Sequence, residues 1–122
     1  MHGLVAAARA ARERAYAPFS RFAIGAAVED EHGHIFTGCN IESASYGLTI
    51  CAERVAVFKA VSEAAGQLRR VAVVADSETL VTPCGACRQI LWEFCGGGEL
   101  ILANLAGREE SVPIASLFPR PF

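Results

Sequence analysis

Three cysteines and one glutamate occupy two short motifs that could form one metal site. Cys51 and Glu53 lie in "ICAERVAVF", and Cys84 and Cys87 lie in "TPCGACRQIL". The Cys-x-x-Cys spacing places two sulfurs on one face of a helix and is a common two-ligand zinc motif. Standing alone, the same spacing is also that of a thioredoxin-like redox pair. Because Cys51 also begins a predicted helix, the set favours a metal site with three thiolate ligands.

Three protein ligands would leave the fourth position of a tetrahedral zinc ion to water, which is the arrangement of a catalytic zinc site. Zinc lowers the pKa of bound water from 15.7 toward roughly 7. We expect Glu53 to lie beside this water and to shuttle protons, since it does not share the direction of Cys51 on the helix. A closed structural site would need a fourth cysteine. Cys39 stays open as that ligand, whereas Cys95 lies about 16 Å along the helix from Cys84.

Two arginines follow the two halves of the motif, Arg54 in "CAER" and Arg88 in "CGACR". Three thiolates around Zn²⁺ carry a net charge of −1, which weakens the metal as a Lewis acid unless a neighbouring cation offsets it. We therefore expect at least one arginine to donate hydrogen bonds to the sulfurs, with Arg54 favoured.

The elements that position these motifs follow from apolar periodicity and from helix and strand breakers. Helices are expected at residues 3–16, 51–65 and 84–95. Strands are expected at residues 22–28, 35–39, 70–76, 99–105 and 109–114. The first two strands form a hairpin, Gly66 closes the second helix, and "RVAVVAD" is a central strand covered on both faces. This order implies a mixed sheet with helices on its faces, in one domain spanning residues 1–122.

Composition limits the class of protein. With 122 residues, 52% hydrophobic and 20% charged, the chain can bury one core and is too apolar to be disordered. It has no run of about 18 apolar residues and no signal-peptide pattern, so we expect a cytoplasmic protein that does not bind membranes. A net charge of −2 argues against a nucleic-acid partner. Five cysteines without an export signal favour metal binding or catalysis over disulfides.

Four longer segments resemble the small homotetrameric cytidine deaminases with a three-cysteine zinc site. These segments are "YAPFSRFAIGAAV", "GCNIESASYGLTICAERVAVFKAVSE", "VTPCGACRQIL" and "LFPRPF". The resemblance implies a three-layer α/β/α sandwich around a mixed five-stranded sheet. It implies zinc-dependent hydrolysis of cytidine and deoxycytidine to uridine and deoxyuridine, with release of ammonia, in pyrimidine salvage. It also implies one zinc ion per subunit and a homotetramer whose active sites are completed by neighbouring subunits.

The resemblance also assigns roles to individual residues. It makes zinc ligands of Cys51, Cys84 and Cys87, and a proton shuttle of Glu53. The substrate contacts that it implies fall into three kinds, which concern the base, the ribose and the neighbouring subunit's pocket. They are Phe22 and the backbone of Ala52 for the base, Asn40 and Glu42 for the ribose hydroxyls, and Ala44, Tyr46 and Phe122 for the neighbouring pocket. The alternation in "CNIES" allows both ribose-binding side chains to point the same way from an extended segment.

Other readings stay open. A zinc deaminase for a modified cytosine nucleoside is one, although "CNIE" as a ribose clamp argues for an unmodified sugar. A deoxycytidylate deaminase would need a basic phosphate pocket, and only Arg21 stands near the expected mouth. From another class, the chain could be a catalytically silent, zinc-stabilised interaction module. His32 and His34 in the hairpin turn are interpreted as solvated loop residues, and Trp92 as packing on the third helix.

Overall fold

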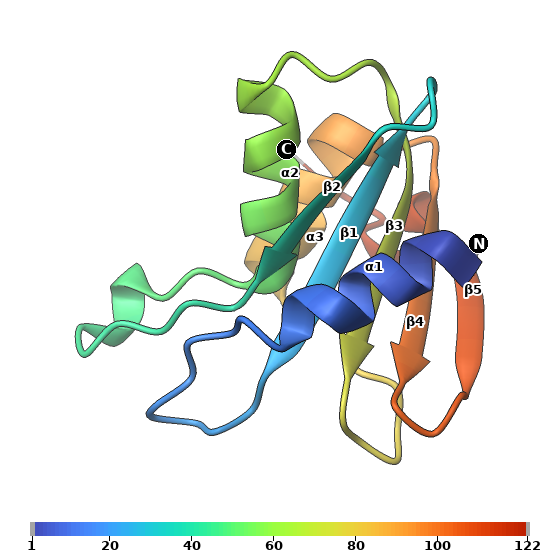
Figure 1. The fold of residues 1–122 in the computed structure, drawn as a ribbon. Coiled ribbons are helices and arrows are strands. Elements are labelled where there is room, and N and C mark those ends of the chain that lie inside the picture. The colour runs from blue at the N-terminus through green and yellow to red at the C-terminus, as the bar shows by residue number, and fades with distance from the viewer. Residues whose placement is uncertain (1, 122) are drawn as a thin grey trace.

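A computed structural model describes residues 2–121 and contains a five-stranded mixed sheet (Figure 1). Its strands are β1 (Ile24–Asp30), β2 (Ile35–Cys39), β3 (Leu68–Ala75), β4 (Glu99–Asn104) and β5 (Glu109–Pro113). They lie in the order β2-β1-β3-β4-β5. The β3–β4 pair is parallel, and the β2–β1, β1–β3 and β4–β5 pairs are antiparallel. The predicted hairpin of β1 and β2 and the central position of β3 are confirmed.

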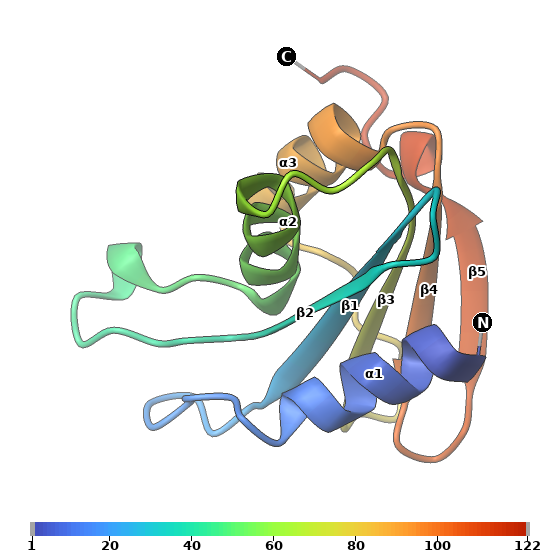
Figure 2. The same ribbon diagram turned by 45° about the horizontal axis from the view of Figure 1, so that its top comes forward.

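Helices cover both faces of this sheet. They are α1 (His2–Arg12), α2 (Ala52–Ser62) and α3 (Gly85–Cys95), with 3-10 turns at Tyr46–Leu48 and Ile114–Leu117. Helix α1 lies on one face, and α2 and α3 lie side by side on the other (Figures 1 and 2). The predicted three-layer α/β/α sandwich is therefore confirmed. Within residues 2–121, none of the helices has the length and apolar character needed to cross a bilayer.

Alternate residues of a strand pack into two separate hydrophobic cores, because successive side chains of a strand point to opposite faces of the sheet. Ala26 and Val28 of β1 pack into the core beneath α2 and α3. Ala27, between them, packs with Ala8 of α1 into the core on the other face. The α2 surface that lies in the first of these cores is made mainly of small residues, Ala52, Ala56, Val57 and Ala60. Helix α2 therefore lies close against the sheet.

Several element boundaries differ from those expected. Helix α1 ends at Arg12 and not near residue 16, because the backbone of Tyr16 is hydrogen-bonded to Asn40 and Glu42 at 2.9 and 2.8 Å. Helix α2 ends at Ser62, and Ala64 adopts the left-handed conformation with φ 58°. The prediction that Gly66 closes this helix was therefore wrong. The remaining strands and α3 lie within about two residues of their predicted bounds.

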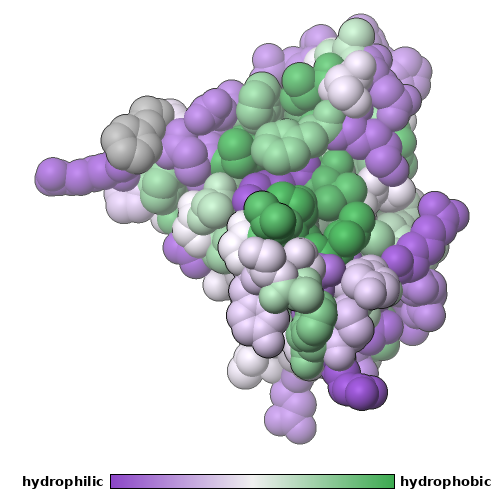
Figure 3. Space-filling model, turned by 90° about the vertical axis from the view of Figure 1, so that its left-hand side faces the viewer, coloured by the Kyte–Doolittle hydropathy of each residue, from purple (hydrophilic) through white to green (hydrophobic). Residues whose placement is uncertain are grey.

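Residues 41–50 form a loop that projects from the body between β2 and α2 (Figures 1 and 2). The loop carries large apolar side chains in exposed positions, with Tyr46 74% and Leu48 69% exposed. Figure 3 looks onto this side of the molecule and shows apolar residues gathered near the centre of the view. Such an exposed apolar surface is typical of an interaction site.

Gly38 sets the distance between β2 and α2, which yields a test of the fold. A Cβ at Gly38 would lie 2.5 Å from Ala56 N and 2.6 Å from Ala52 O. Because both are backbone atoms, Gly38→Ala must displace α2, and we expect the Tm to fall by roughly 5–15 °C in thermal unfolding followed by circular dichroism. Gly3→Ala is the control, since a Cβ there meets nothing within 4 Å. Equal Tm values for Gly38→Ala and the unchanged protein would contradict this packing.

Candidate active site

The first residues of α2 and α3 bring three cysteine sulfurs together. Cys51 is the N-cap of α2, Cys84 is the N-cap of α3, and Cys87 lies in the first turn of α3. The Sγ atoms of Cys51 and Cys84 are 3.7 Å apart, and all three sulfurs lie within 4.8 Å of one another. Thiols that are 33 positions apart in the chain thus meet where two helices begin.

This sulfur cluster fits a tetrahedral zinc ion. Zinc–sulfur bonds of about 2.3 Å place neighbouring sulfurs about 3.8 Å apart, close to the observed spacing of Cys51 and Cys84. Cys87 is buried, whereas Cys84 is exposed, so the cluster has an open side. Within residues 2–121, the cluster contains neither Cys39 nor Cys95. The geometry therefore suits three protein ligands and an accessible fourth position.

Positive charge offsets the negative charge of the thiolates. Both helix N-termini direct unpaired backbone N–H groups and positive dipole ends toward the sulfurs. Arg54 Nη2 donates to Cys51 Sγ at 3.6 Å. A hydrogen bond from the Cys87 thiol, and then one from Arg54, lower the pKa of Cys51. The pKa of Cys87 is raised, because its thiol proton is held in the hydrogen bond to Cys51. Arg88 donates instead to the Pro83 carbonyl, at 2.8 Å.

Glu53 occupies the first turn of α2, beside the sulfur cluster. Its side chain lies in the interior, and the residue is only 4% exposed. Burial raises the pKa of Glu53 to about 7, so this carboxyl gains and loses a proton near neutral pH. Within residues 2–121, its Oε1 atom has no hydrogen-bond partner. A buried polar atom without a partner is unusual in a folded protein, and at this position it is available to a bound molecule.

A cavity of about 290 Å³ connects the sulfur cluster to the residues expected to bind substrate. Its lining brings together Phe22, Asn40, Glu42, Cys51, Glu53 and Cys84, all of which were predicted as site residues. The lining also contains residues that the sequence did not single out, namely Ser20, Ile24, Thr49, Val81 and Thr82. No spacing rule would have found these five, because they come from loops and a strand end that only the fold brings to the cavity.

The two predicted ribose-binding residues also build the wall of the cavity. Asn40 accepts from Ile24 N at 2.9 Å and donates to Phe22 O at 2.8 Å. Glu42 accepts from Phe19 N at 2.9 Å and from the backbone and side chain of Ser20. These bonds fix the segment before β1 on which Phe22 lies. The hydrogen bond from the Ser20 side chain, followed by that from its backbone, lowers the pKa of Glu42.

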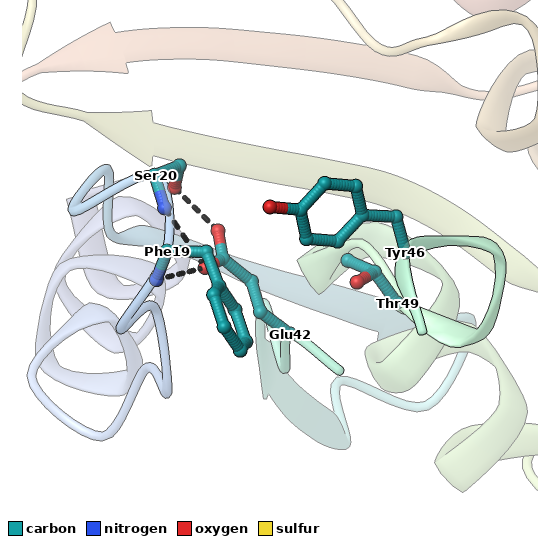
Figure 4. A pocket seen from close by; sticks show the side chains of 5 residues that line it. All are labelled: Phe19, Ser20, Glu42, Tyr46 and Thr49. Carbon is teal, nitrogen blue, oxygen red and sulfur yellow. Dashed lines mark hydrogen bonds between the residues drawn. The ribbon is translucent and has the colours of Figure 1, made fainter. Parts of the chain in front are cut away.

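A second hollow of about 410 Å³ lies next to the first and shares residues with it (Figure 4). It is lined by Phe19, Ser20, Glu42, Tyr46 and Thr49. The Tyr46 ring lies across from Phe19, with ring centroids 5.8 Å apart and an edge-on orientation. Tyr46 therefore borders this hollow and not the cavity beside the sulfurs.

The other predicted contacts are Ala44, the backbone of Ala52 and Phe122. The side chain of Ala44 is exposed on the projecting loop, outside the linings of the two hollows. Ala52 is fully buried and lies outside the linings of the two hollows. Phe122 lies outside the described residues.

Comparison with known proteins decides the family. The model of the "Cytidine and deoxycytidylate deaminase zinc-binding region" matches residues 2–102. The chain belongs to this family. A cytidine deaminase of Sporosarcina psychrophila is 50% identical, covering 98% of this chain and 88% of the relative. One from Halalkalibacterium halodurans is 48% identical, covering 98% and 91%. The crystal structure of a Burkholderia pseudomallei cytidine deaminase superposes with a TM-score of 0.95 at 44% identity, covering 99% and 98%.

The hydrogen bond from Arg54 to Cys51 predicts that Arg54 strengthens metal binding in this family member. Hydrogen bonds to charged groups contribute about 1.5–3 kcal/mol, so Arg54→Gln should weaken zinc binding by roughly ten- to hundredfold. Competition with a chromophoric chelator measures this affinity. Lys59→Gln, which removes an exposed cation from the same helix, should leave it unchanged. If both variants bound zinc as tightly as the unchanged protein, Arg54 would have no such role.

Proposed function

We propose that this chain catalyses the zinc-dependent hydrolytic deamination of cytidine and deoxycytidine to uridine and deoxyuridine, with release of ammonia, in pyrimidine salvage. Family membership supports this activity, as do relatives named cytidine deaminase that cover nearly the whole chain. The observation that carries the proposal is the buried, unpartnered Oε1 of Glu53 in the cavity that also contains Cys51 and Cys84. A purely structural zinc site has no need for such a carboxyl group.

Cys51, Cys84 and Cys87 are proposed to hold the zinc ion, and Glu53 to transfer protons. Zinc bound there would supply a Lewis acid that makes water acidic enough to give hydroxide near pH 7. Water oxygen adds to C4 of the cytosine ring, and Glu53 delivers the proton it has taken from the water to N3. Glu53 then moves the remaining hydroxyl proton to the amino group, the C4–N bond breaks, and ammonia leaves as the C4 carbonyl forms.

The rest of the cavity suits a nucleoside. Phe22 provides a half-buried aromatic ring on the wall, available to stack on a base. Asn40 and Glu42 retain donor and acceptor capacity beyond their bonds to the wall, which suits ribose hydroxyls. Among the described residues, neither hollow is lined by Lys or Arg, and the pKa of Glu42 is lowered, so it is negatively charged at neutral pH. A substrate phosphate would meet no cation there, which favours nucleosides over deoxycytidylate.

We further propose that residues 1–122 form one catalytic domain, with one zinc ion per subunit, working in the cytoplasm as a homotetramer. The five free cysteines suit a reducing compartment. The projecting loop supports assembly, because it exposes Tyr46 and Leu48 beside the site, where a neighbouring subunit would cover them. In such an assembly Ala44, Tyr46 and Phe122 are the residues proposed to reach the neighbouring pocket.

Replacement of Glu53 tests the proposed chemistry. Glu53→Gln keeps the shape of the side chain but cannot carry a proton, so turnover should fall by about 10²–10⁴-fold or more while zinc stays bound. Loss of cytidine absorbance in the ultraviolet measures turnover, and elemental analysis measures zinc. Glu63→Gln, on an exposed residue at the end of α2, is the matched control and should retain full activity. A Glu53→Gln variant with near-normal turnover would place the proton shuttle elsewhere.

A charge on the projecting loop tests the proposed assembly. Leu48→Glu should prevent subunits from burying this side chain, giving a smaller species in light scattering and a loss of turnover of at least tenfold. Ala106→Glu adds the same charge to an exposed residue of the turn between β4 and β5 and should change neither property. A fully active monomer of the unchanged protein would rule out a pocket shared between subunits.

A further inference from the structure

Arg88, in the first turn of α3, joins two segments that are far apart in the chain. Its Nε donates to Pro83 O at 2.8 Å, and its Nη2 donates to Thr82 Oγ1 at 3.3 Å. Its Nη1 donates to Leu117 O, in the turn Ile114–Leu117, at 3.1 Å. One guanidinium group thus holds the residues immediately before Cys84 and the turn that follows β5.

The segment that Arg88 holds forms part of the cavity wall. Residues 76–84 connect β3 to α3, and Val81, Thr82 and Cys84 of this segment line the cavity that contains Glu53. Within residues 2–121, no backbone–backbone hydrogen bond fixes residues 77–83. Side chains hold the segment instead. Asn104 donates to Ser77 O at 3.0 Å near its beginning, and Arg88 holds its end.

The position of Cys84 depends on this end of the segment. Cys84 is the N-cap of α3, so its backbone is extended and its sulfur follows the orientation of the Pro83–Cys84 peptide. The carbonyl of that peptide belongs to Pro83, whose own nitrogen has no N–H, so the preceding Thr82–Pro83 peptide cannot donate a hydrogen bond. Arg88 holds this carbonyl with the shortest of its three hydrogen bonds. The 3.7 Å separation between the sulfurs of Cys84 and Cys51 therefore rests in part on Arg88.

We propose that Arg88 is a positioning residue of the metal site, which fixes Thr82, Pro83 and Cys84 against the turn Ile114–Leu117 and so holds the Cys84 sulfur in place. It acts through the carbonyls of Pro83 and Leu117 and the hydroxyl of Thr82, and not through the sulfurs. The inference rests on the proposed function, because the three sulfurs must bind zinc for their spacing to matter. A planar guanidinium meets three acceptors in fixed directions, which the single ammonium of a lysine cannot do.

Metal binding by Arg88→Gln and Arg88→Lys tests this role. Loss of hydrogen bonds from a charged group should weaken zinc affinity, measured by chelator competition, by about ten- to hundredfold in both variants. The absorption bands of the Co²⁺-loaded protein should also shift, because one sulfur is displaced. Arg108→Gln is the matched control, since in the described part of the chain the hydrogen bond from the Arg108 side chain to this segment goes to Glu78 O, at 3.5 Å. It should leave the affinity and the spectrum unchanged.

A second variant separates an effect of Arg88 on the position of Cys84 from an effect on the folding of the protein. Thr82→Val removes one acceptor and leaves Arg88 in place, and it should weaken zinc binding by about two- to tenfold without lowering the Tm of the metal-free protein. If Arg88→Gln does not fold, this variant decides the question by itself. Wild-type zinc affinity in Arg88→Lys, or in Thr82→Val, would overturn the role of Arg88 while the proposed function stands. Failure of the unchanged protein to bind zinc would overturn both.

Discussion

The meeting of two helix N-termini on one face of the sheet is the constraint on which the site depends. Cys51 begins α2 and Cys84 begins α3, and their sulfurs stand 3.7 Å apart. Thiolates this close repel one another unless positive charge lies nearby, and the helix dipoles, Arg54 and a bound metal all provide it. The small residues under α2 and the absence of a side chain at Gly38 let that helix approach the sheet closely enough for the contact.

Placing a carboxyl group beside this cluster follows from the same geometry. Glu53 is two residues beyond Cys51, so the first turn of α2 places it beside the sulfurs and in the lining of the same cavity. Burial there costs free energy while the carboxyl is charged, which is why its pKa rises to about 7. The cluster of sulfurs and the proton carrier are thus positioned by one helix start. The far wall of the cavity comes from Asn40 and Glu42, which hold the segment before β1.

The sequence predicted the helices and strands and the proximity of the three cysteines, since both follow from local patterns. Periodicity located the helices and strands, and helix-start spacing grouped the three cysteines with Glu53. The sequence did not predict the features that depend on contacts between residues far apart in the chain. The early end of α1 is set by the hydrogen bonds that Tyr16 N donates to Asn40 O and that Tyr16 O accepts from Glu42 N. The end of α2 is set by the left-handed backbone of Ala64. Ser20, Thr49 and Thr82 reach the cavity only through the fold.

X-ray absorption at the zinc K edge of the purified protein distinguishes an open three-sulfur site from a closed one, because it counts the ligands and identifies their elements. We expect one zinc per chain with three sulfur ligands near 2.3 Å and one lighter oxygen ligand near 2.0 Å. Cys39→Ser should leave this spectrum unchanged. Four sulfur ligands, or a spectrum that loses one sulfur in Cys39→Ser, would show a closed structural site and rule out an open catalytic position.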